Sequence, residues 1–227
     1  RQPESFGIAL AKHFVDDTAP VTRARIKLEM YPWNRLSHDG TPHPHAFARD
    51  GGYVRTATVT YDGTNLWVVS GVQDYVVLKT TDSEFWGYLQ DKYTTLKPTH
   101  DRVMATSVTG QWWHTDSGAD WNKSYDSAVA TMSSVFAGHH SLALQQTMFA
   151  MGEAMIAEQP EIGEVRFSLP NKHHFVIDLS PYGLENPNEV FHADDRPYGF
   201  IEGTIHNDLH KDAAPAPNQA FDPGQGW

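Results

Sequence analysis

The sequence contains no cysteine, no long apolar run and no excess of basic residues. Without cysteine the chain has neither disulfides nor thiolate metal sites, which fits a reducing cytoplasm. No apolar run approaches the roughly 18 residues of a membrane-spanning helix, and no signal peptide opens the chain. The formal net charge of −11 argues against a nucleic-acid partner, because binding phosphates requires a basic face. We therefore expect a cytoplasmic protein without a membrane or nucleic-acid partner, in which any anionic substrate meets a locally positive pocket.

The 227 residues are enough for one large hydrophobic core or two small ones. Phe6, Leu10 and Phe14 share one helical face, which predicts an amphipathic helix that buries them. Apolar residues at intervals of four, three and four predict two more such helices, the second with Ser141 as its N-cap. The three predicted helices cover residues 3–17, 125–136 and 144–155.

Alternation of apolar and polar residues predicts strands at residues 21–33, 53–61, 66–80, 102–113, 164–169 and 198–207. Asp62-Gly63 is typical of a tight turn, so antiparallel pairing is the natural inference. The remaining connections are predicted as a turn-rich segment at 37–45, a packed loop with short helical pieces at 81–96 and a loop at 181–197.

Residues 164–178 form the most informative stretch of the chain. Val165, Phe167 and Leu169 alternate with polar residues, which predicts a strand with one buried face, and Pro170 should interrupt its pairing. If the alternation continues, Asn171 and His173 extend the apolar face. Buried polar groups need partners. We expect either a turn cap for Asn171 and a backbone carbonyl for His173, or a ligand that bonds to both.

Residues 168–179 read Ser-Leu-Pro-Asn-Lys-His-His-Phe-Val-Ile-Asp-Leu and resemble the signature of the uricase (urate oxidase) family. Further segments are similar to that family in the same order, and together they cover nearly the whole chain before its C-terminal tail. These segments are Ser-Glu-Phe-Trp-Gly-Tyr at 83–88, Asp-Lys-Tyr-Thr-Thr-Leu at 91–96, Asp-Arg at 101–102, Ser-Leu-Ala-Leu-Gln-Gln-Thr-Met at 141–148, Asn-Pro-Asn-Glu-Val-Phe at 186–191 and Arg-Pro-Tyr-Gly at 196–199. Each match is weak alone, and the set is specific.

The resemblance implies an α+β fold of tandem tunnelling-fold (T-fold) modules. Each module is an antiparallel β-sheet with amphipathic helices packed on one face, and the modules oligomerise into a barrel around a tunnel. The predicted order from Leu66 onward, strand, strand, helix, helix, strand, strand, matches one module. We therefore expect the C-terminal part of a first module at residues 1–62, a second module at 63–210 and a flexible tail at 211–227.

Uricases are cofactor-free oxidases, so the resemblance implies conversion of urate, dioxygen and water to 5-hydroxyisourate and hydrogen peroxide without a metal or flavin. Urate is a planar anion at neutral pH. The resemblance implies that the guanidinium fork of Arg102 and the amide of Gln145 bind its opposite edges. The structural alternatives are a surface ion pair of Arg102 with Asp101 or Asp91, and an exposed helical glutamine at position 145.

The other site residues carried over from the family surround the same ligand. The resemblance places Phe85 on the purine face, where ordinary core packing is the alternative, and Leu96 and Leu144 in the pocket wall. It places Asn171 beside dioxygen, and His173 in a proton relay with a threonine and a lysine. Histidine suits a relay because its ordinary pKa lies near neutral pH.

In uricases that threonine and lysine lie in an N-terminal segment, and nothing within residues 1–19 resembles their motif. The family's active sites form between subunits. We therefore expect this chain to hold one side of an intersubunit site in a homotetramer, with a companion N-terminal segment that supplies the lysine and threonine. The chain starts at Arg1 and goes directly into a predicted helix, so we expect the remainder of a longer polypeptide. Its last residues, Gly-Gln-Gly-Trp, are not a Ser-Lys-Leu peroxisomal address.

Two other functions are open from the sequence. The 13 histidines, with His38, His43 and His45 close together, suggest a zinc-dependent T-fold enzyme acting on pterins or purines. No His-x-x-x-His pattern falls on one face of a predicted helix, and adjacent strand residues such as His173 and His174 point to opposite faces. A non-catalytic purine-binding module is the third possibility, favoured only by the missing N-terminal segment.

Overall fold

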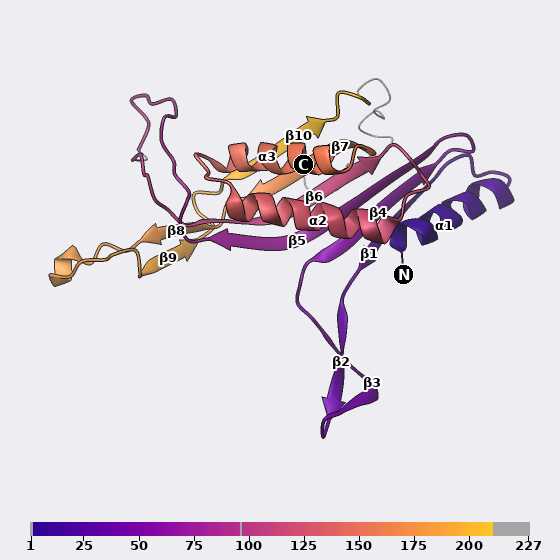
Figure 1. Cartoon of the computed structure of the whole chain (residues 1–227), viewed down its shortest axis with the longest axis horizontal. Coiled ribbons are helices and arrows are strands. Elements are labelled where there is room, and N and C mark those ends of the chain that lie inside the picture. Colours follow the sequence, from indigo (N-terminus) through magenta and orange to yellow (C-terminus); the bar gives the residue numbers. More distant parts are fainter. Residues whose placement is uncertain (1, 96, 211–227) are drawn as a thin grey trace.

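The computed structural model of the chain describes residues 2–95 and 97–210. A six-stranded antiparallel sheet forms its centre (Figure 1). The strands lie in the order β1 (Ala24–Met30), β4 (Val54–Tyr61), β5 (Leu66–Lys79), β6 (Met104–His114), β7 (Ile162–Pro170) and β10 (Phe200–His206). Two small sheets are added to it: β2 (Trp33–His38) with β3 (Thr41–Arg49), and β8 (His173–Val176) with β9 (Phe191–Asp194).

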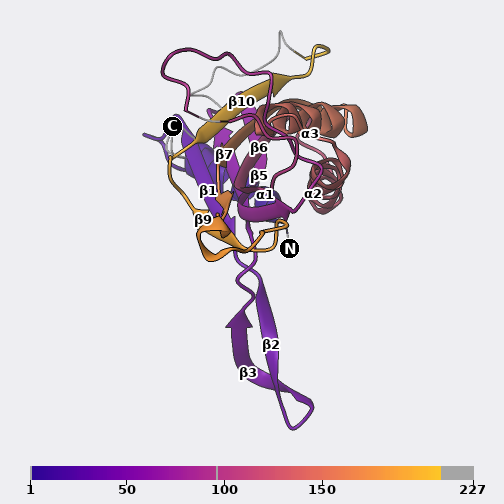
Figure 2. The same cartoon turned by 90° about the vertical axis from the view of Figure 1, so that its left-hand side faces the viewer.

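Three helices lie on one face of the large sheet (Figures 1 and 2). α1 (Pro3–Asp17) packs on β1 and β4, whereas α2 (Trp121–Gly138) and α3 (Leu144–Glu158) lie side by side over the later strands. Within the described residues, none of these helices is long and apolar enough to cross a membrane.

The main core lies between the sheet and the pair α2 and α3. Val165, Phe167 and Leu169 of β7 are fully buried there, which confirms the predicted buried face, whereas the predicted solvent-exposed face is wrong because Glu164 and Ser168 are buried as well. Met151 and Met155 of α3 are also fully buried and fill the space above the sheet. The core therefore fixes the start of α3 and the end of β7, the two places from which predicted site residues project.

The predicted buried face of α1 is wrong. Phe6 is 59% exposed and Phe14 is 41% exposed, whereas Glu4, Gly7 and Ala11 are buried. The reason is close packing, because a Cβ added at Gly7 would lie 2.8 Å from side-chain atoms of both Leu28 and Val59. Glu4 is buried because it has an internal partner, the guanidinium of Arg55, at 2.8 Å.

The predicted connections also need correction. The turn-rich segment at 37–45 is a turn only at Asp39-Gly40, where both residues have positive φ. The residues that follow form β3, and a two-stranded ribbon tolerates Pro42 and Pro44 because each strand has a free edge. This hairpin projects away from the sheet in both views (Figures 1 and 2).

Two more loop predictions differ from the structure. The described residues of 81–96 contain no helix. They are held by isolated bridges between Ser83 and Ser141 and between Phe85 and Thr99. The region 181–197 contains β9, and a short 3-10 helix (Ser180–Tyr182) overlaps its start. β9 was missed because its pairing with β8 is made within a small separate sheet.

The predicted module boundary falls in the turn between β4 and β5, and it stays a prediction. The predicted flexible tail at 211–227 lies outside the described residues.

Candidate active site

A cavity of about 560 Å³ lies where the loop before β6, the start of α3, the segment after β7 that includes β8, and the start of β10 meet. This volume suits a small organic ligand. Six predicted site residues line it, and the seventh, Leu96, lies outside the described residues. The six are Phe85, Arg102, Leu144, Gln145, Asn171 and His173.

Arg102 is held by the loop from which it projects. Its backbone N–H donates to the carbonyl of Ser83 at 2.9 Å, and its Nε donates to the carbonyl of Glu84 at 3.1 Å. Burial lowers the pKa of the Arg102 guanidinium from its ordinary value. Within residues 2–95 and 97–210 it forms no salt bridge, and Asp101 instead accepts a hydrogen bond from Thr81 at 2.9 Å. Its terminal nitrogens are therefore available to a ligand.

Phe85 lies beside Arg102, whose guanidinium carbon is 5.2 Å from the centre of the ring. The Phe85 backbone is fixed by reciprocal hydrogen bonds with Thr99, at 2.8 and 2.9 Å. Tyr88 stacks on the ring with a centroid distance of 4.5 Å and an interplanar angle of 16°. Tyr88 and the Arg102 guanidinium therefore both contact the Phe85 ring, which also lines the cavity.

Leu144 and Gln145 are the first two residues of α3. The prediction of Ser141 as N-cap is wrong, because the cap position is Ala143, which has extended backbone. The Ser141 hydroxyl instead donates to the carbonyl of Ala143 at 2.9 Å and accepts from Thr147 at 2.7 Å. The positive end of the α3 dipole nevertheless borders the cavity, with Leu144 buried and Gln145 exposed.

Asn171 follows β7 directly and is anchored through its backbone, whose N–H donates to the carbonyl of Gly199 at 2.7 Å. A Cβ at position 199 would lie 2.6 Å from the Asn171 amide nitrogen. Glycine at 199 therefore leaves room for the Asn171 side chain at the edge of the cavity.

His173 Nε2 lies 2.9 Å from the carbonyl oxygen of Pro197. A carbonyl can only accept, so Nε2 carries the proton and Nδ1 is an acceptor in the neutral ring. The imidazole also stacks on Phe175 with an interplanar angle of 17°. The backbone carbonyl that the sequence analysis considered as a partner of His173 is thus the carbonyl of Pro197, which binds Nε2. Nδ1 carries no proton in this tautomer and can accept one.

Several lining residues had no predicted role. Lys97 and Lys172 line the cavity together with Arg102, whereas Asp101 is the one acidic residue among the described lining residues. This positive lining contrasts with the net charge of −11 and matches the pocket expected for an anion. Asn188 also lines the cavity. It lies in the segment at 186–191 that resembles uricases, and this resemblance could have indicated a place at the site.

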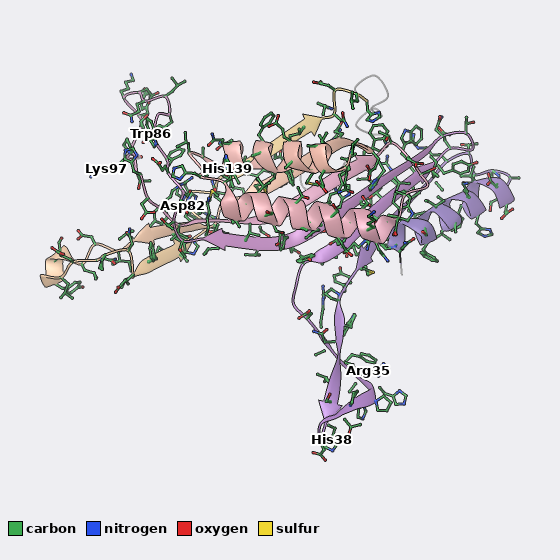
Figure 3. All side chains as sticks on the ribbon, viewed as in Figure 1. Arg35, His38, Asp82, Trp86, Lys97 and His139 are labelled. Carbon is green, nitrogen blue, oxygen red and sulfur yellow. The ribbon has the colours of Figure 1, made fainter. Side chains whose placement is uncertain are left out.

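The histidines do not form a metal centre in the part of the chain that the structure describes. No group of three or more His, Cys, Asp or Glu side chains there is placed to hold a metal ion. His38 lies at the tip of the β2–β3 hairpin beside Arg35, away from Lys97 and Trp86 on the loop before β6 (Figure 3).

Comparison with known proteins identifies the family. The uricase family model matches residues 8–60 and 68–202. The chain is 46% identical over 202 residues to the uricase of Arthrobacter globiformis, covering 89% of this chain and 66% of that protein. It is 39% identical over 217 residues to the uricase of Aspergillus flavus, covering 89% of this chain and 72% of that protein. The chain thus spans about two thirds of the length of the Arthrobacter relative.

Solved structures agree with this result. The crystal structure of the Arthrobacter globiformis uricase matches with a TM-score of 0.87 and 45% identity, covering 95% of this chain and 73% of that one. A uricase structure from Bacillus fastidious, at 20% identity, matches with a TM-score of 0.72 and supports the fold alone. The predicted α+β T-fold architecture is confirmed, and the zinc-dependent alternative is not favoured. The chain belongs to the uricase family.

Proposed function

We propose that this chain carries one side of the active site of a urate oxidase, which converts urate, dioxygen and water to 5-hydroxyisourate and hydrogen peroxide. The observation that carries this proposal is the convergence of Arg102, Gln145 and His173 on one cavity from three distant parts of the sequence. Family membership supports the reaction, and the lining of the cavity supports the choice of these residues to perform it.

The cavity suits a flat anion. The terminal nitrogens of Arg102 make no hydrogen bond or salt bridge with the described residues, and their fork can donate two parallel hydrogen bonds to a ligand. Gln145 can both donate and accept, and Phe85 places an aromatic ring in the wall of the cavity. Lys97 adds positive charge that favours the urate anion.

The proposed chemistry needs proton transfer and orientation from the protein. Urate loses two electrons and dioxygen gains them, so protons must leave the purine and reach the departing peroxide. His173 suits this transfer because Pro197 orients the ring through Nε2 and leaves Nδ1 as an acceptor. Asn171, beside His173 at the same cavity, is proposed to orient dioxygen.

We further propose that a companion segment completes the site within a homotetramer, with active sites at subunit interfaces. α3 is covered by α2, and β7 pairs with β6 as well as β10. α1 is followed by β1 in the chain, just as α3 is followed by β7. Within the described residues, however, β1 pairs only with β4, and Phe6 and Phe14 of α1 are exposed. β1 and the cavity lie at opposite edges of the sheet, so a further strand and helix beside β1 would supply the proposed lysine and threonine to the site of a neighbouring subunit.

Urate binding under anaerobic conditions tests the pocket without the oxidation step. We expect Arg102→Ala to raise the dissociation constant roughly 30-fold or more, because the anion loses a buried countercharge. Arg35→Ala, on the projecting hairpin in Figure 3, is the matched control and should bind urate as the parent chain does. Equal affinity of the Arg102→Ala and parent chains would refute the pocket assignment.

Measuring peroxide release during urate turnover distinguishes the cofactor-free oxidase from the zinc enzyme and from the non-catalytic module. Urate-dependent release of peroxide that survives treatment with a chelator is expected for a cofactor-free oxidase. Loss of this activity on metal removal would favour the zinc enzyme, and urate binding without peroxide release would favour the non-catalytic module.

A further inference from the structure

Glu84 lies next to the cavity-lining Phe85, and its carboxylate is enclosed by two imidazoles. Its Oε2 is 2.6 Å from His100 Nδ1, and its Oε1 is 2.6 Å from His140 Nε2. The Glu84 side chain is only 15% exposed, although both histidines lie at the surface. His100 precedes Arg102 by two residues, and His140 lies in the connection that leads into α3. The carboxylate thus joins the two segments that carry Arg102 and Gln145.

The backbone of Glu84 joins the same two segments. Its N–H donates to the carbonyl of Ser141 at 2.7 Å, and its carbonyl accepts the hydrogen bond from Arg102 Nε at 3.1 Å. A neighbouring bond, from the Ser141 N–H to the carbonyl of Asp82 at 3.0 Å, extends this connection. Figure 3 shows Asp82 and His139 close together at the base of the loop that carries Trp86 and Lys97.

We infer that Glu84 is a positioning residue for the urate site, which fixes Arg102 relative to the first turn of α3. The inference rests on the proposed function, in which Arg102 and Gln145 bind opposite edges of one rigid ligand. Binding at both edges depends on the separation of the two side chains, because a hydrogen bond weakens steeply when its distance and angle depart from the preferred values. The Glu84 carboxylate does not line the cavity, so it acts through Arg102 rather than on the ligand.

The electrostatics of the cluster support this role. Hydrogen bonds from His100 and His140 hold the pKa of the Glu84 carboxyl below its ordinary value, so the group is ionised and accepts from both rings at neutral pH. Asp82 also lies beside the cluster, with its carboxylate 4.0 Å from His140 Nδ1. This separation exceeds hydrogen-bond distance, so the contact that orients the His140 ring is the one between its Nε2 and Glu84.

The test combines anaerobic urate binding with a double-mutant cycle. We expect Glu84→Ala to raise the dissociation constant for urate roughly tenfold, and Glu84→Gln to recover most of this loss, because an amide can still bond to both neutral imidazoles. In an Arg102→Ala background, Glu84→Ala should have little further effect, since its influence is exerted through Arg102. Glu153→Ala, an exposed glutamate of α3, is the matched control.

The outcomes are separable from those of the proposed function. If the parent chain does not bind urate, the proposed function fails. If the parent binds urate and Glu84→Ala binds it equally well, or if the loss is the same in the Arg102→Ala background, only the positioning role is overturned. Should Glu84→Ala not fold, His100→Ala and His140→Ala each remove one of the two bonds and should each weaken binding by a smaller factor; unchanged binding in both would overturn the inference.

Discussion

At the scale of single residues, His173 is the group whose two nitrogens have different surroundings. Nε2 bonds to the carbonyl of Pro197, whereas Nδ1 has no hydrogen-bond partner among the described residues, and the residue lines the cavity. We expect His173→Ala to lower the turnover number for urate roughly 100-fold or more, the usual contribution of a positioned acid or base. The dissociation constant for urate should change by less than about threefold, because the ring carries no fixed countercharge for the anion.

Peroxide formation and anaerobic binding measured on the same preparations separate these effects. His192→Ala is the control, since His192 is exposed on the neighbouring strand β9 and does not line the cavity. Comparable losses in turnover and in affinity would contradict a relay role for His173.

The cavity residues could be named from the sequence because segments around them are similar to a known family, not because their patterns are informative alone. An exposed Gln145 at a helix start is ordinary, and Arg102 beside Asp101 is typical of a surface ion pair. Lys97 and Glu84 could not be assigned a role in this way. The proposed role of Lys97 depends on its place in the cavity wall, and that of Glu84 on its contact with His140 across 56 positions of sequence.

At the scale of elements, a buried polar network fastens α1 to the sheet. Glu4 of α1 accepts hydrogen bonds from Arg55 of β4 and from Ser70 of β5, both at 2.8 Å. The Ser70 hydroxyl lies 3.0 Å from Nε2 of His114 on β6. Because Ser70 donates to Glu4, His114 Nε2 donates to Ser70, and the network links one helix to three strands.

His114 makes this network sensitive to acid. Burial, reinforced by the charge of Arg55, lowers the pKa of His114 to about 4 from 6.5. Between those two pH values the unfolded chain binds a proton that the folded chain does not, so the free energy of unfolding falls as the pH falls through this window. Below both pKa values, the total loss in the free energy of unfolding from this group is roughly 3 kcal/mol.

Urea unfolding at pH 7.5 and at pH 5 measures the effect. We expect His114→Gln to be less stable than the parent at pH 7.5 but to lose less stability between the two pH values. His13→Gln, on the exposed surface of α1, is the control and should keep the pH dependence of the parent. An unchanged pH dependence in His114→Gln would contradict the assignment.

The sequence predicted the positions of helices and strands more reliably than the face that each helix buries. Alternation located every strand of the large sheet, and the spacing of apolar residues located all three helices of the described chain. The face of α1 was mispredicted because an apolar stripe was assumed to turn toward the sheet. Gly7 and Ala11 permit a closer approach to the sheet than the stripe of Phe6 and Phe14 would.

At the scale of the whole molecule, the two halves of the large sheet are covered by different numbers of helices. α2 and α3 pack together over the later strands, whereas α1 packs alone on β1 and β4. Phe6 and Phe14 of α1 are exposed, as is Phe149 of α3. Exposed aromatic side chains on an ordered helix are typical of a surface that another element covers. We interpret the α1 surface formed by Phe6 and Phe14 as the docking face of the proposed companion segment.

Activity should therefore depend on this surface as well as on the cavity. We expect peroxide formation from urate to rise at least tenfold when the chain is mixed with a polypeptide carrying the N-terminal segment of the Arthrobacter globiformis uricase. The double change Phe6→Ser and Phe14→Ser should abolish this rise without altering anaerobic urate affinity, because the docking face lies on a different element from Arg102. Phe149→Ser, which replaces an exposed phenylalanine on α3, is the control and should respond as the parent does. Full activity of the chain in the proven absence of any N-terminal segment would instead show that the proton relay needs no lysine and threonine from outside it.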